Sequence, residues 1–220
     1  MTANLRASMN WAPKPRAMPD QRIRPVHWVI GLVWLVAVLA CSVLLWRYKS
    51  APGPAGAAPP RWPVESTIER SHEEPTLLLF AHPWCPCTRA SLGELAVILS
   101  KANGHVKAHV LFDRPASESD DWTQTDLWRS ATAIPGVTAH VDGDGVEAHR
   151  FGAETSGHVV LYDASGALLF AGGITNARGH AGDSAGRRAG RSLIATGKAN
   201  RSVAPTFGCT IDKPELAEKR

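Results

Sequence analysis

Two of the four cysteines in this 220-residue chain stand one residue apart, in the run Trp84-Cys85-Pro86-Cys87. Proline is favoured at the first position of a helix, where its missing N–H costs nothing, and it keeps the preceding residue out of the helical conformation. The spacing therefore predicts that Cys85 caps a helix that begins at Pro86. The free amides and the positive end of such a helix favour thiolate over thiol. A thiolate in that place is a nucleophile for disulfide exchange.

The partner of Cys85 stays open at the level of sequence. With Cys85 outside the helix, a bond to Cys87 is feasible but strained, and strained disulfides are more oxidising. Cys209 is the alternative partner and a candidate third redox cysteine, and a purely structural disulfide is the remaining interpretation. Because the motif directly follows an apolar run, we expect the Cys85 sulfur at an exposed edge of a sheet. Cys41 lies in a long apolar stretch and is interpreted as a small apolar residue.

Histidines near the cysteines raise a second kind of chemistry. Soft thiolates suit Cu(I), and imidazole nitrogens bind copper and zinc. We expect no cofactor, because lone histidines are mostly ordinary surface or core residues, and we keep copper as the alternative. His158 is a further candidate ligand, and the alternative metal set consists of His82, Cys85, Cys87 and His180.

The elements that must position the motif alternate between strand-like and helix-like runs. Residues 76–81 form a continuous apolar run of strand length that leads straight into the cysteines, and residues 88–101 carry leucines at helical spacing. A glycine-rich run from Arg178 to Asp183 matches no phosphate-loop spacing and is interpreted as a connecting turn. This order favours an α/β sandwich. The other expected elements are a strand at 109–113, a helix at 120–133, a hairpin of 158–162 with 167–171, and a helix at 182–196.

The order of strand, Trp-Cys-x-Cys, amphipathic helix, second strand and later hairpin resembles the thioredoxin superfamily over roughly residues 75–175. The resemblance implies an α/β three-layer sandwich, with Cys85 as the attacking thiol, Cys87 as the resolving thiol, and Trp84 and Pro86 as supporting residues. One residue separates the cysteines where the family has two. Gly157 stands at the place of the family's cis-proline, and residues 120–140 have no clear counterpart and resemble an insertion.

A different segment, from Trp28 to Trp46, contains no charged residue. At 1.5 Å per residue it is long enough to cross a hydrocarbon core of roughly 30 Å, and aromatic residues stand at both ends, as is typical of membrane interfaces. A signal peptide has a shorter apolar part of about 7–15 residues, so we expect an uncleaved anchor. The excess of cations before the span places the N-terminus in the cytoplasm; these cations are Arg6, Lys14, Arg16, Arg22 and Arg24.

Four regions follow from these observations. Residues 1–25 are predicted to be a disordered cytoplasmic tail and residues 26–48 a transmembrane helix. Residues 49–63, rich in proline, alanine and glycine, are predicted to be a linker that holds the folded part away from the lipid. Residues 64–220 are predicted to form one thioredoxin-like domain on the extracytoplasmic side, which is the periplasm in a bacterium.

The formal net charge of +4 and the absence of a cationic run argue against nucleic-acid binding. We therefore expect a membrane-anchored thiol–disulfide oxidoreductase that acts on protein thiols or disulfides. Its electrons would come from another redox protein, because no nucleotide or flavin signature is present. The alternatives are a thioredoxin-fold protein that binds or delivers copper, and a redox-inert tethered interaction module.

Overall fold

The computed structural model describes residues 25–211, and the chain divides into two compact units, Met1–Val43 and Leu44–Arg220. Helix α1, Pro25–Ser50, has a mean hydropathy of 2.6 in its most apolar window and no buried residue. It is long and apolar enough to cross a membrane, a test that a signal sequence near the N-terminus also passes. The predicted tail, up to residue 24, lies outside the described residues.

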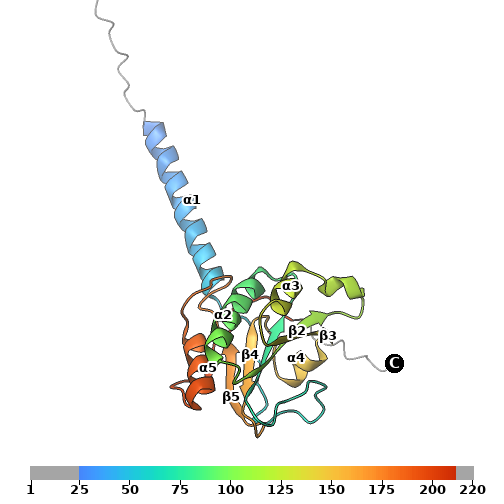
Figure 1. The fold of residues 1–220 in the computed structure, drawn as a ribbon. Coiled ribbons are helices and arrows are strands. Elements are labelled where there is room, and N and C mark those ends of the chain that lie inside the picture. Colours follow the sequence, from blue (N-terminus) through green and yellow to red (C-terminus); the bar gives the residue numbers. More distant parts are fainter. Residues whose placement is uncertain (1–24, 212–220) are drawn as a thin grey trace, which may run out of the picture. The chain divides into compact units, whose positions relative to one another are not determined.

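One mixed six-stranded sheet, in the order β3-β2-β1-β4-β5-β6, organises the second unit (Figure 1). Strands β1, β2 and β3 run parallel, whereas β4 is antiparallel to both β1 and β5. All six residues of β1 are buried, because β1 has a strand on each side and helices over both faces. The strands are β1 Thr76–Ala81, β2 Lys107–Arg114, β3 Val137–Gly143, β4 His158–Tyr162, β5 Leu168–Gly173 and β6 Val203–Ala204.

Helices cover the two faces of this sheet unequally, which makes three layers (Figure 1). One face packs on α2, α3 and α5 through residues such as Leu95, Leu127 and Leu193. The other face packs on the short α4, where Phe151 meets Phe80. The helices are α2 Pro86–Ala102, the 3-10 turn η1 Asp120–Thr123, α3 Asp126–Thr132, α4 Val146–Arg150 and α5 Ala185–Thr196.

The α/β three-layer sandwich predicted from the sequence is confirmed, with three differences in detail. The helix expected over 120–133 is split into η1 and α3, because Thr125 caps a new helix by accepting a hydrogen bond from the Trp128 amide. The segment interpreted as an insertion is part of the sheet: α3 leads into β3, which pairs in parallel with β2. The last helix begins at Ala185, not at Gly182.

The proline-, alanine- and glycine-rich stretch expected to be a linker lies along the domain. The Pro59 carbonyl accepts a hydrogen bond of 2.9 Å from the Tyr162 hydroxyl. Gly56 packs so closely that a Cβ atom there would lie 1.7 Å from the Gly152 carbonyl oxygen. The structure thus corrects the expectation of a free spacer, since the small residues permit close packing of this segment on the domain.

Candidate active site

The Cys-Pro-Cys motif lies at the start of α2, directly after the central strand β1. Cys85 is the N-cap, in an extended conformation with φ −86° and ψ 118°, and Pro86 is the first helical residue. The Thr88 amide donates to the Cys85 carbonyl at 3.0 Å, which closes the first turn. The prediction that proline begins the helix and leaves Cys85 at its cap is confirmed.

Ser156, just before β4, ties the end of β1 to the start of α2. Its hydroxyl accepts a hydrogen bond of 2.9 Å from the His82 amide and lies 2.8 Å from the Thr88 hydroxyl. The next residue, Gly157, has a φ of +89° and donates its amide to the Phe80 carbonyl at 2.7 Å. These contacts fix the position of the turn that carries Cys85.

Cys209 reaches the same place from the far end of the chain. Its segment runs beside the residues before β4: the Ser156 amide donates to the Cys209 carbonyl at 2.8 Å, and Thr210 pairs with Thr155 in an antiparallel bridge. Gly208 fits only as glycine, since a Cβ atom would lie 1.9 Å from the Ser156 carbonyl oxygen. The three cysteines of the domain therefore converge, as free thiols in this structure.

The surroundings of the Cys85 sulfur favour its ionised form. Burial by itself raises the pKa of Cys85, but hydrogen bonds outweigh it. The Cys209 thiol donates to the sulfur, and the amides of Cys209, Cys87 and Thr88 point at it, so that the pKa lies below that of an ordinary cysteine. The Cys85 side chain forms no capping hydrogen bond. The amides of Cys87 and Thr88 therefore stabilise its thiolate mainly as nearby dipoles.

The other two thiols are held in their protonated forms. Burial, the charge on Cys85 and a hydrogen bond to its sulfur raise the pKa of Cys87, against the Gly179 amide and the charge of Arg178. Burial and the hydrogen bond to Cys85 raise the pKa of Cys209 to about 12, again against Arg178. Of the three thiols, Cys85 is thus the one that ionises most readily, which is the arrangement needed for a first attack by Cys85.

The expectation of an exposed Cys85 sulfur is wrong. Cys85 is 1% exposed and Cys87 is 9% exposed, whereas Cys209 is partly accessible. Trp84 is itself 61% exposed and packs on Trp122, with 5.8 Å between the ring centres. Cys209 is one of the residues that meet the Cys85 sulfur, and no local pattern reveals this arrangement.

The histidines proposed as metal ligands do not assemble a site with the cysteines. Within residues 25–211, no group of three or more histidine, cysteine or acidic side chains is placed to hold a metal. His158 is buried and its Nδ1 lies 3.1 Å from the Thr206 hydroxyl, while His180 is exposed in the loop after β5. The described residues thus do not bring His82, Cys85, Cys87 and His180 together as one metal-ligating group, and copper binding stays a prediction.

Two contributors to the site were missed at the level of sequence, Ser156 and the Arg178–Gly179 pair, as was the contact of the Thr88 hydroxyl with Ser156. Arg178 donates to the Gly208 carbonyl, next to Cys209. The glycine-rich run around Arg178 is predicted from the sequence to be a turn, but nothing in its residues indicates that it lies near the cysteines. Such contacts join positions thirty or more residues apart.

Comparison with known proteins gives structural matches only. No family model matches the chain, and no curated protein matches it. A hypothetical protein of Sinorhizobium meliloti is 18% identical, with a TM-score of 0.53 over 75% of this chain and 97% of the other. An uncharacterised conserved protein of Geobacillus kaustophilus is 14% identical, with a TM-score of 0.55 over 77% and 97%. An exposed lipoprotein thioredoxin of Streptococcus pneumoniae is 16% identical, with a TM-score of 0.39 over 56% and 85%.

The architecture defines a class. A parallel β1–α2–β2 unit, an antiparallel β4–β5 hairpin, and cysteines at the start of α2 make up a thioredoxin-like fold. The fold is thus thioredoxin-like, and it carries a one-residue Cys-Pro-Cys spacing and a third cysteine brought to the motif from the C-terminal segment.

Proposed function

We propose that this chain is a membrane-anchored, extracytoplasmic thiol–disulfide oxidoreductase in which Cys85 attacks a protein disulfide. The observation that carries the proposal is the Cys85 sulfur at the helix N-cap, where it faces the Cys209 thiol and the backbone amides of Cys209, Cys87 and Thr88. That environment stabilises the thiolate, which is the reactive form in disulfide exchange. The apolar helix α1 supports the anchor, and the sequence-based charge asymmetry supports the orientation.

The resolving thiol is Cys87 or Cys209. Both share a hydrogen bond with the Cys85 sulfur, so either is near enough to attack it once Cys85 is bound to a substrate. Electrons would be returned by an upstream dithiol protein. Because Cys85 is 1% exposed, a substrate disulfide reaches it only if segments around it move.

The test uses the full-length protein in detergent and a model protein disulfide. Cys85→Ser is expected to abolish turnover, whereas Cys41→Ser, in the apolar helix, serves as the matched control and is expected to retain it. In the wild type, Cys85 is expected to be alkylated at a pH below that of an ordinary thiol. Unchanged turnover in Cys85→Ser would remove the proposal.

The pairing is decided by a redox titration of three variants that each lack one cysteine of the site. Loss of the two-electron transition in Cys87→Ser but not in Cys209→Ser would assign the disulfide to Cys85–Cys87, and the reverse result would assign it to Cys85–Cys209. A cysteine pair that stays oxidised at every potential tested would instead support an inert interaction module.

A further inference from the structure

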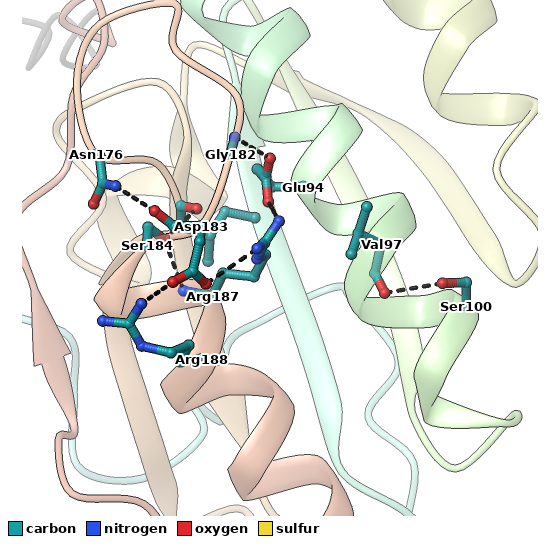
Figure 2. Close-up of polar contacts among 10 residues, drawn as sticks. Glu94, Val97, Ser100, Asn176, Gly182, Asp183, Ser184, Arg187 and Arg188 are labelled. Atoms are coloured by element: carbon teal, nitrogen blue, oxygen red, sulfur yellow. Dashed lines mark hydrogen bonds and ion pairs between the residues drawn. The ribbon is translucent and has the colours of Figure 1, made fainter.

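The loop between β5 and α5 is anchored on α2 through a buried carboxylate (Figure 2). One oxygen of Glu94 accepts the Gly182 amide at 2.6 Å, and the other pairs with Arg187 at 2.6 Å. The Ser184 hydroxyl donates to the Ile174 carbonyl at 2.7 Å and closes the loop at its base. The loop is therefore held in one position against the helix that begins at the cysteine motif.

Arg178 lies within this loop and reaches the segment that carries Cys209. Its Nη1 donates to the Gly208 carbonyl, and its guanidinium lies 5.0 Å from the centre of the Tyr48 ring. Its Nε is buried and has no hydrogen-bond partner among the residues that the structure describes. A buried donor without an acceptor costs free energy, and it is available to a charged acceptor that forms beside it.

The charge of Arg178 is not neutralised by a nearby acid. The loop carboxylate of Asp183 pairs with Arg187 and Arg188, and Glu94 pairs with Arg187. No described carboxylate pairs with Arg178 itself. Its positive charge is left to act on the thiols of Cys87 and Cys209, whose pKa values it lowers against the stronger effects of burial and of Cys85.

We propose that Arg178 is a positioning residue for the resolving step, in which its charge and its free Nε–H stabilise the thiolate that forms on Cys87 or Cys209. This inference rests on the proposed function and identifies a residue that assists the resolving step. Cys85 does not need this help, because the Cys209 thiol and the backbone amides already stabilise its thiolate.

Disulfide exchange at this site takes two steps. The first attack joins Cys85 to one substrate sulfur, and the other substrate sulfur leaves as a thiolate and takes up a proton. The resolving thiol then loses its proton to water, and its sulfur attacks the Cys85 sulfur. A new intramolecular disulfide forms, the bond from Cys85 to the substrate breaks, and the second substrate thiolate is protonated. Two electrons pass from the protein dithiol to the substrate disulfide, and an upstream dithiol protein returns them.

The experiment compares Arg178→Gln with Arg188→Gln, which removes an exposed arginine of the same region that pairs only with Asp183. Both are made in the full-length protein. Formation of the mixed disulfide and its resolution are timed separately by acid quenching and mass spectrometry. Arg178→Gln is expected to leave the first step unchanged and to slow resolution about tenfold, the loss expected for one hydrogen bond to a charged group. Arg188→Gln is expected to change neither step.

A second readout is the pH dependence of alkylation of Cys87 and Cys209 in a Cys85→Ser background. Its midpoint is expected to rise in Arg178→Gln and to move back toward the wild type in Arg178→Lys, which keeps the charge. Equal resolution rates and equal midpoints in Arg178→Gln and Arg188→Gln would overturn the inference. Absence of any mixed disulfide in the wild type would instead overturn the proposed function, so the two failures are distinguishable. The unchanged first step also shows that the variant is folded.

Discussion

Cys209 is the residue on which the chemistry of the site depends most, apart from Cys85 itself. Its thiol is the side-chain donor to the Cys85 sulfur, and its backbone amide points at the same atom. Replacing it therefore tests how the Cys85 thiolate is stabilised, independently of which cysteine forms the disulfide.

Cys209→Ala is expected to raise the pKa of Cys85, because the thiolate loses its side-chain donor while the amides remain. A thiolate is populated above its pKa, so alkylation of Cys85 below neutral pH should become slower. The measurement is the rate of iodoacetamide labelling of Cys85 against pH. Cys209→Ser keeps a donor and should lie closer to the wild type. An unchanged profile in Cys209→Ala would contradict the assignment.

His158 makes a prediction about stability, because burial lowers its pKa to about 4. The unfolded chain, with an ordinary histidine pKa of about 6.5, binds more protons than the folded protein between these values. The free energy of unfolding should therefore fall as the pH is lowered from 6.5 towards 4, by up to about 3 kcal/mol from this residue.

Urea unfolding of the full chain between pH 4 and pH 7 measures this dependence. His158→Gln removes the titrating group, so its stability should vary less steeply with pH than that of the wild type. A residual slope is expected from His109, whose pKa is also lowered to about 4, by burial and by the neighbouring His140. Identical slopes in the variant and the wild type would show that His158 does not titrate in this way.

At the scale of elements, α2 and α5 are joined by the pair of Glu94 and Arg187 (Figure 2). The side chains are 4% and 16% exposed, so the carboxylate has little access to water. This pair also holds the loop that presents Arg178, since Glu94 binds the Gly182 amide.

Arg187→Met is expected to destabilise the protein by about 3–5 kcal/mol, because it leaves a buried carboxylate without its partner. Arg188→Met removes an exposed pair with Asp183 and should cost less than about 1 kcal/mol. Chemical denaturation of both variants gives the comparison. In the double variant Glu94→Gln with Arg187→Met, part of the loss should be recovered. An equal loss of unfolding free energy in the two single variants would show that the buried α2–α5 pair stabilises the protein no more than an exposed pair does.

At the scale of the whole chain, the proposed function attaches the thioredoxin-like unit to a membrane. Helix α1 has the length and apolar composition for this, and none of its residues is buried within the protein. An uncleaved anchor and a signal sequence predict different products for the same gene.

We expect the mature protein to keep its N-terminus and to remain in the membrane pellet after carbonate extraction. Leu39→Arg places a charge near the middle of α1 and should weaken insertion, at a cost of about 2.5–3.5 kcal/mol on the insertion scale. The substitution Arg61→Gln, beyond the helix, is the control. A soluble protein whose mass shows loss of the apolar segment would support a signal sequence and exclude the anchor.

Local sequence patterns determined much of the secondary structure of this protein. The apolar run of residues 76–81 is β1, proline after Cys85 begins α2, and the turn at 163–166 joins β4 to β5. Each of these depends on neighbouring residues, whose propensities and spacing act over a few positions. The α/β sandwich follows from the order of such elements.

Tertiary structure alone decided what surrounds the Cys85 sulfur. Cys209 arrives from 124 residues away, Arg178 comes from a loop, and Ser156 links β1 to α2. The packing of residues 53–62 on the domain was equally hidden. The physical reason is that such contacts depend on how whole elements pack and on which distant segments lie side by side. Residue type and local spacing do not specify either.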